Sequence, residues 1–126
     1  MQNSIKNFLK YWGPLCIYAG IIFYVSSISK PLPDIGIPSF DKLLHVFEFV
    51  VFGFLASRAF RHSSWLKGGA SYRIVIWASL AAILYGISDE FHQSFVPGRI
   101  FSLFDVLADS IGGTLGAFIY GRNHTI

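Results

Sequence analysis

Four long apolar segments, at about residues 13–29, 43–60, 74–91 and 103–120, constrain the fold of this chain more than any other feature. At about 1.5 Å per helical residue, each segment is long enough to cross a hydrocarbon core of about 30 Å. The chain is 53% hydrophobic and 13% charged, and 126 residues are too few to bury that much apolar surface away from water. We therefore predict one all-α domain over residues 1–126, an integral membrane protein with four transmembrane helices.

The connections between these segments are short, about ten to a dozen residues each, so consecutive helices should be antiparallel neighbours in an up-down bundle. Lys6 and Lys10 before the first segment, with Ser27 and Ser29 after it, resemble a signal peptide. Three comparable segments follow, however, and the first is long for the apolar region of a signal peptide. We therefore interpret it as a retained helix.

Cys16 is the single cysteine, which excludes a disulfide within one chain.

The distribution of lysine and arginine predicts the orientation of the bundle, because cytoplasmic loops carry an excess of both. Seven of these residues lie on the face that holds both termini, and three lie on the opposite face. The seven are Lys6, Lys10, Arg58, Arg61, Lys67, Arg73 and Arg122, and the three are Lys30, Lys42 and Arg99. Both termini are therefore expected in the cytoplasm. Because the ten basic residues are scattered between apolar segments, the net charge of +3 does not point to nucleic acid as a partner.

Polar side chains of interest gather at the opposite, extracytoplasmic face. Six of the seven carboxylates belong to this group, the exception being Asp34 in the first outer loop, and helical spacing places five of the six on inward faces of the last three helices. The three faces consist of Asp41, His45 and Glu48; Asp89, His92 and Gln93; and Ser102, Asp105 and Asp109. Three helices are thus expected to direct acids toward one place.

Burial in a membrane makes this gathering costly. Glu48 and Asp109 should lie a turn or two below the interface, where an isolated charge costs at least about 2.5 kcal/mol. Neither is expected to face lipid. Gly112 and Gly116 have the spacing of small residues that let two helices approach closely, so the last helix should turn Asp105 and Asp109 inward.

The charge of the predicted site requires compensation, because six carboxylates against Lys42 and Arg99 leave about four negative charges. Protonated acids, protonated His45 and His92, a divalent cation, or a cationic group on a ligand could each supply it. Mixed carboxylate and histidine ligands suit Zn²⁺ or Mn²⁺, and an all-oxygen set suits Mg²⁺ or Ca²⁺. The expected metal ligands are Glu48, Asp89 and Asp109, although no spacing here is diagnostic of a metal.

Each candidate residue has a proposed role and, in several cases, a structural alternative. The candidates for acid–base chemistry are Asp41, His45, Glu48, Asp89, Glu90, Asp105 and Asp109. The candidates for binding a headgroup are Lys42, His92, Gln93 and Arg99. Asp41 could instead only cap its helix, Lys42 and Arg99 could extend to the interface, and Gln93 could be an interhelical hydrogen-bond partner.

The motifs that carry these residues resemble the VanZ-like family of bacterial membrane proteins. The matching pattern is Asp41-Lys42-x-x-His45, Tyr85-x-x-x-Asp89-Glu90-x-x-Gln93-x-Phe95, Pro97-Gly98-Arg99, and Asp105 with Asp109 before a glycine-bearing helix. It spans about residues 38–118. The resemblance implies a multi-pass protein of the bacterial cytoplasmic membrane and a role in the cell envelope, as in family members that give low-level teicoplanin resistance. It does not imply a reaction.

Three functions follow from these observations. The first is an enzyme or binder acting on the headgroup of an envelope lipid or cell-wall precursor, with a divalent metal as a candidate cofactor. The second is a non-enzymatic module that binds an antibiotic, a wall precursor or a partner protein. The third is a small transporter or a proton or cation relay, in which two copies could dimerise to form a path. The lipid bilayer is the partner that all three share.

Overall fold

The computed structural model describes residues 2–28, 40–63, 66 and 70–123, except for the side chains of residues 2, 3, 40, 41 and 123. Within these ranges, the regular elements are four α-helices: α1 (Gln2–Ser26), α2 (Phe40–Arg61), α3 (Ser71–Gln93) and α4 (Leu103–Asn123). Each contains a span of 20 or 23 residues that is long and apolar enough to cross a membrane. The prediction of an all-α protein with four membrane-spanning helices is confirmed.

The helix bounds differ from the apolar segments chiefly at the amino terminus. The expected bounds of α2, α3 and α4 are met within three residues, but α1 begins at Gln2 rather than at residue 13. An apolar segment marks the part of a helix that lies in hydrocarbon, and the helix itself can continue into the interface. The residues before 13 include Ile5, Phe8 and Leu9, which are well exposed on the surface of α1.

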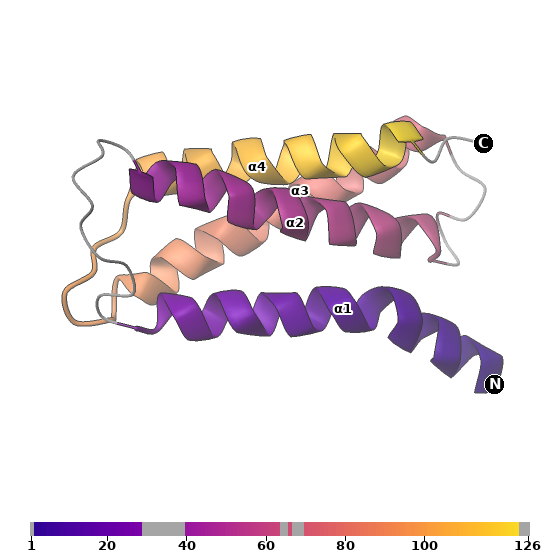
Figure 1. Cartoon of the computed structure of the whole chain (residues 1–126), viewed down its shortest axis with the longest axis horizontal. Coiled ribbons are helices and arrows are strands. Elements are labelled where there is room, and N and C mark those ends of the chain that lie inside the picture. Colours follow the sequence, from indigo (N-terminus) through magenta and orange to yellow (C-terminus); the bar gives the residue numbers. More distant parts are fainter. Residues whose placement is uncertain (1, 29–39, 64–65, 67–69, 124–126) are drawn as a thin grey trace.

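Pro14 lies inside α1, and Figure 1 shows that the amino-terminal part of this helix bends away from the other helices. Proline has no backbone N–H, so the carbonyl of Lys10, one turn earlier, loses its helical donor. Arg58 of α2 supplies a replacement, because its Nη1 donates to the Lys10 carbonyl at 3.0 Å. The Arg58 guanidinium also lies 4.7 Å from the centre of the Tyr11 ring. The bend in α1 is thereby tied to α2.

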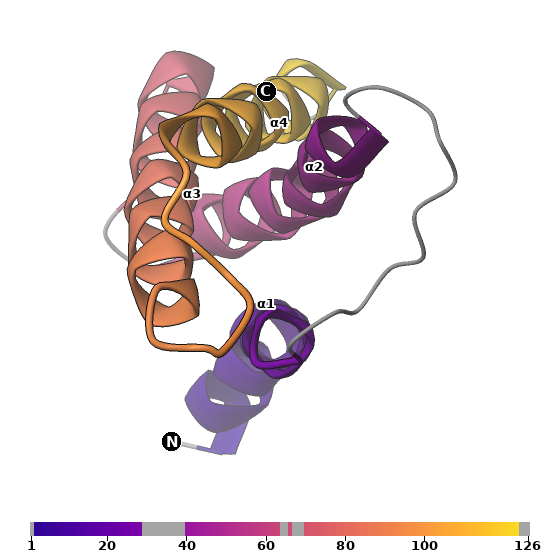
Figure 2. The same cartoon turned by 90° about the vertical axis from the view of Figure 1, so that its left-hand side faces the viewer.

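The helices run alternately up and down, and α2, α3 and α4 form the closely packed part of the bundle (Figures 1 and 2). The most extensive contact is between α2 and α4. Added Cβ atoms at Gly112 and Gly116 of α4 would collide with the backbone carbonyls of Val46 and Val50 of α2. Only glycine allows the two backbones to lie this close, as the small-residue spacing predicted.

The interior of the bundle is apolar, and so is most of its outer surface. Phe49, Ala56, Ala78, Ala82 and Ala117 are completely buried. The outward faces carry large apolar side chains, and among them Leu103, Phe104, Leu107 and Ile111 of α4 are between 56 and 73% exposed. Exposure of this much apolar surface to water would be unfavourable, so the lipid bilayer covers it.

Helix α1 lies beside the other three rather than among them (Figure 2). It contacts α2 and α3, but within the described residues it makes no contact with α4. Hydrogen bonds from side chains to backbone hold it in place: the Tyr85 hydroxyl donates to the Ala19 carbonyl, and the Tyr18 hydroxyl donates to the Glu48 carbonyl at 2.8 Å.

Candidate functional site

The buried acids lie at one end of the bundle, where α1 and α3 end and α2 and α4 begin (Figure 1). Four carboxylates are almost inaccessible: Glu90 and Asp109 are 0% exposed, Asp89 is 4% and Asp105 is 8% exposed. A buried carboxylate is stable only when other groups compensate its charge and occupy its oxygens. The identity of those groups indicates what the site can bind.

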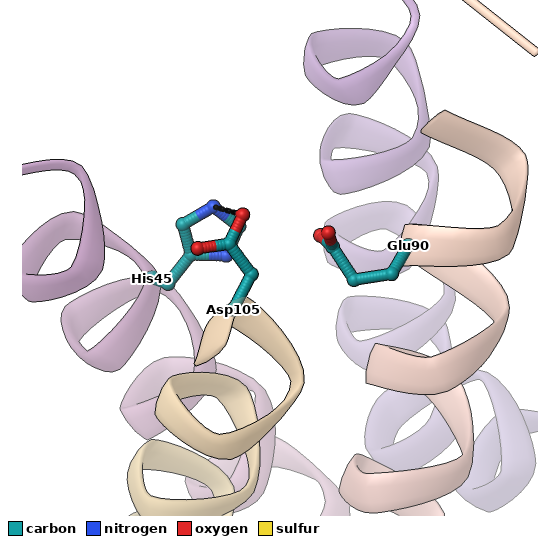
Figure 3. A group of neighbouring side chains, drawn as sticks. All are labelled: His45, Glu90 and Asp105. Atoms are coloured by element: carbon teal, nitrogen blue, oxygen red, sulfur yellow. Dashed lines mark ion pairs between the residues drawn. The ribbon is translucent and has the colours of Figure 1, made fainter. Parts of the chain in front are cut away.

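His45 connects two of these acids. Its Nδ1 lies 2.7 Å from Oδ1 of Asp109, and its Nε2 lies 3.6 Å from Oδ2 of Asp105. Figure 3 shows His45 beside Asp105, with the Glu90 carboxyl directed toward both from α3. Because both ring nitrogens face carboxylates, a protonated, positively charged imidazole suits this position.

Asp105 has a second cationic neighbour. Its Oδ1 lies 2.6 Å from Nζ of Lys42, one turn before His45 on α2. The Asp105 amide donates to Oγ of Ser102 at 3.2 Å, which makes Ser102 the cap of α4. The Ser102 amide in turn donates to Oε1 of Glu90 at 3.2 Å. Glu90 and Ser102 therefore fix the start of α4 and the position of Asp105.

A turn between α3 and α4 brings Arg99 to the same place. Gly98 has a φ of 82°, and the Arg99 amide donates to the Val96 carbonyl at 3.0 Å. Proline followed by glycine is typical of a type II turn, in which the glycine position needs a positive φ. Arg99 then donates from Nε to the carbonyl of Ile28, just beyond α1, at 2.9 Å.

Gln93 connects Arg99 with Glu90. In the amide orientation that satisfies both neighbours, the Gln93 oxygen accepts from Nη1 of Arg99 at 2.9 Å and its nitrogen donates to Oε2 of Glu90 at 3.3 Å. Glu90 lies on α3 with Gln93, and Arg99 lies in the turn that follows, so these bonds hold the turn against α3 and do not join two helices as was expected of Gln93. The third nitrogen of the guanidinium, Nη2, is buried and has no partner in the described part of the chain.

Other buried oxygens of the site also have no donor among the described residues: both oxygens of Asp89 and Oδ2 of Asp109. The Ser26 hydroxyl faces Asp89 but donates to the Phe23 carbonyl at 3.0 Å. Buried polar atoms without partners are rare, and each costs free energy. In this site they include both acceptors and a donor.

Two of the sequence candidates lie at the margin of this group. His92 turns toward α1, where its Nε2 lies 2.9 Å from Oγ of Ser27 and its ring stacks on Phe23 at 4.2 Å. Glu48 is half-buried, one turn below His45. Asp41 lies in the first turn of α2, but its side chain lies outside the described residues.

Two sets of three residues have ligand atoms within 4.8 Å of one another: His45, Glu90 and Asp105, and Asp89, Glu90 and Asp109. Asp89 and Asp109 were expected to share a metal with Glu48. The structure groups them instead with Glu90, the residue after Asp89 on α3. Helical spacing on α3 did not indicate that Glu90 shares a site with Asp89. The first set offers mixed ligands, and the second offers only oxygens.

Sequence reasoning missed the contribution of α1 to the site. Ser27, Ser26 and the Ile28 carbonyl reach the end of α3 and the following turn, although Ser27 was considered only as part of a cleavage site and Ser26 was not considered. The available signal was polarity at the end of an apolar helix, on the same face of the membrane as the acids.

The fold and site together define a multi-pass membrane protein with a buried, acid-rich polar site at one end of its bundle. Its family is shown by a family model, VanZ/LLP1, that matches residues 2–123. The chain therefore belongs to the VanZ/LLP1 family, as the resemblance of its motifs predicted. No curated protein and no solved structure matches the chain.

Proposed function

We propose that this protein binds the phosphate-bearing headgroup of an envelope lipid or cell-wall precursor at the site formed by α2, α3 and α4. The observation that carries the proposal is the buried Nη2 of Arg99, a charged donor without a partner among the described residues. Planar guanidinium groups bind phosphate oxygens through paired hydrogen bonds. Arg99 is held for this task by Gln93 and by the Ile28 carbonyl.

The setting also supports a lipid ligand. The site lies at the ends of membrane-spanning helices, so a headgroup bound there would leave its hydrocarbon chain in the bilayer. The excess of lysine and arginine at the other end of the bundle favours an extracytoplasmic site. Together with membership of the VanZ/LLP1 family, this supports a role in the envelope of bacteria and in susceptibility to glycopeptide antibiotics such as teicoplanin.

His45 gives the site a group that can transfer a proton. In the protonated imidazole, Nδ1–H donates to Oδ1 of Asp109, which holds the ring. Nε2–H then faces Oδ2 of Asp105 at 3.6 Å, longer than a hydrogen bond. Nε2 is therefore placed to donate its proton to the oxygen of a leaving group and to take one back from a water molecule.

The test is binding of defined lipids to the purified full-length chain in nanodiscs. The probes are a polyprenyl monophosphate, a polyprenyl diphosphate and the polyprenol of the same length. We expect the phosphate forms to bind at least about tenfold more tightly, and Arg99→Gln to remove most of that difference, because a hydrogen bond to a charged group contributes about 1.5–3 kcal/mol. Arg61→Gln, at the opposite end of α2, is the matched control.

Equal binding of polyprenol and polyprenyl phosphate would reject the proposal. So would equal losses in the Arg99 and Arg61 variants, since a diffuse attraction to phosphate needs no site. Release of inorganic phosphate from the diphosphate, measured in the same samples, distinguishes an enzyme from a binding module.

A further inference from the structure

Three buried carboxylates lie together at the end of the bundle where Gln93 connects Arg99 with Glu90. Asp89 and Glu90 come from α3 and Asp109 comes from α4, and one oxygen of each lies within 4.8 Å of the other two. None of the three side chains is more than 4% exposed. Three carboxylates at this separation repel one another strongly unless a cation lies between them.

Three oxygens of this set have no partner: both oxygens of Asp89 and Oδ2 of Asp109 lack a donor among the described residues. The oxygens of Glu90 accept from the Ser102 amide and from Gln93. Protonation would neutralise the two acids, but it would supply at most one hydrogen to each and would leave further buried lone pairs unsatisfied. A metal ion binds the oxygens and compensates the charge at the same time.

Gly86 creates the space for this arrangement. It lies one turn before Asp89 and Glu90 on the same face of α3. A Cβ at Gly86 would lie 2.9 Å from Cβ of Asp109 and 3.2 Å from its Oδ2. Because position 86 has no side chain, the Asp109 carboxyl can approach α3 and reach the other two acids.

The charge balance supports a divalent ion. The four buried acids of the site are Asp89, Glu90, Asp105 and Asp109, and they outnumber Lys42 and Arg99, the lysine and arginine that reach the site. A divalent cation would offset this excess of negative charge, as burial in a membrane favours.

The alternative set of His45, Glu90 and Asp105 is less suited to an ion. Lys42 already lies 2.6 Å from Asp105. Nδ1 of His45 is directed at Asp109, so two of the three ligands of this set already have charged partners. Glu90 belongs to both sets and does not distinguish them, whereas Asp89 and Asp109 offer oxygens without a partner among the described residues.

We infer that Asp89, Glu90 and Asp109 bind one divalent cation of the kind that prefers oxygen ligands, such as Mg²⁺, Mn²⁺ or Ca²⁺. His45 is a positioning residue, because its bond occupies Oδ1 of Asp109 and leaves Oδ2 available as a ligand. The inference rests on the proposed function only for the role of the bound ion, which would hold the phosphate that Arg99 contacts. Binding of the ion itself requires no lipid.

The test uses Mn²⁺ as the probe with purified, full-length protein in lipid-free detergent micelles. Electron paramagnetic resonance measures the free ion, and we expect one bound Mn²⁺ per chain that Mg²⁺ or Ca²⁺ displaces in competition. Asp89→Asn and Asp109→Asn should each weaken Mn²⁺ binding by about tenfold or more, because affinity depends on the charge count of the ligands. Glu48→Gln is the matched control, since it removes the same charge from the same end of the bundle.

A loss of less than about threefold in Glu48→Gln would support a localised site with these ligands. Equal losses in all three variants would overturn it in favour of diffuse attraction. Absence of Mn²⁺ binding to wild-type protein that elutes as a single folded species would also overturn it. Should a ligand variant not fold, Gly86→Ala provides a second arm. It keeps every charge, and we expect it to lower Mn²⁺ affinity by displacing Asp109.

The two proposals fail in different ways. Mn²⁺ binding with equal affinity for polyprenol and polyprenyl phosphate would reject the proposed function and keep the metal site. Selective binding of phosphate lipids that is unchanged by EDTA, without bound Mn²⁺, would reject the metal site and keep the proposed function.

Discussion

Nδ1 of His45 lies 2.7 Å from Oδ1 of Asp109, so that one contact joins residues 64 positions apart and connects α2 with α4 at the site. Asp109 is fully buried, which leaves its charge without nearby solvent. The contact thus links α2 to α4, and through it His45 sets the orientation of the Asp109 carboxyl.

Removal of either partner of this pair should destabilise the protein. We expect a coupling free energy of about 1–3 kcal/mol from the single and double variants His45→Asn and Asp109→Asn, as for a hydrogen bond to a charged group. Equilibrium unfolding in mixed micelles measures it. A coupling below about 0.3 kcal/mol would contradict the pairing, because variants without mutual contact are additive within that range.

The close contact between α2 and α4 predicts a contrast between two glycines. A Cβ at Gly116 would collide with the backbone of α2 at Val50, whereas one at Gly20 of α1 would meet no atom within 4 Å. Gly116→Ala should lower the free energy of unfolding by about 1–3 kcal/mol, and Gly20→Ala should leave it unchanged or raise it slightly. Equal effects in the same unfolding assay would contradict the packing.

The attachment of α1 to α3 depends on the Tyr85 hydroxyl, which donates to the Ala19 carbonyl. Tyr85→Phe should lower the free energy of unfolding by about 1 kcal/mol through loss of this bond. Tyr72→Phe is the control, since Tyr72 lies on the same helix and is 67% exposed. We expect thermal unfolding to separate the two variants, and identical curves would refute a role for this bond.

The orientation of the bundle can be tested with single cysteines in a Cys16→Ser background. Phe95 lies beside the site and is 72% exposed, and Arg61 ends α2 at the other end of the bundle. An impermeant maleimide added to intact cells should label Phe95→Cys, and should label Arg61→Cys only after the membrane is opened. The reverse pattern would place the site in the cytoplasm.

The fold was largely predictable because each membrane-spanning helix needs its own apolar segment, which is a property of local sequence. The start of α1 was not, since the segment at 13–29 marks the hydrocarbon span and the helix begins at Gln2. Likewise, no local pattern indicates that α1 lies beside the other helices, because its position depends on which surfaces fit together.

The site was predictable as a set of residues, but not as a set of contacts. Helical spacing placed His45 and Asp109 on inward faces, whereas the distance between them depends on the close approach of α2 and α4. Spacing likewise grouped Asp89 with His92, yet the structure turns His92 to Ser27 and places Glu90 beside Asp109. Pairings across helices depend on rotation and depth, which a single sequence does not record.

The way α1 is held has a consequence for how freely its sequence can change. Arg58, Tyr85 and Arg99 donate to the carbonyls of Lys10, Ala19 and Ile28, and every amino acid supplies a carbonyl. Apart from Tyr18, whose hydroxyl donates to the Glu48 carbonyl, and the buried Leu15 and Ile22, most side chains of α1 can therefore be exchanged for others of similar polarity while these three acceptors stay in place. The donors on the opposite side have no such freedom, so mutational tolerance should be asymmetric across this interface.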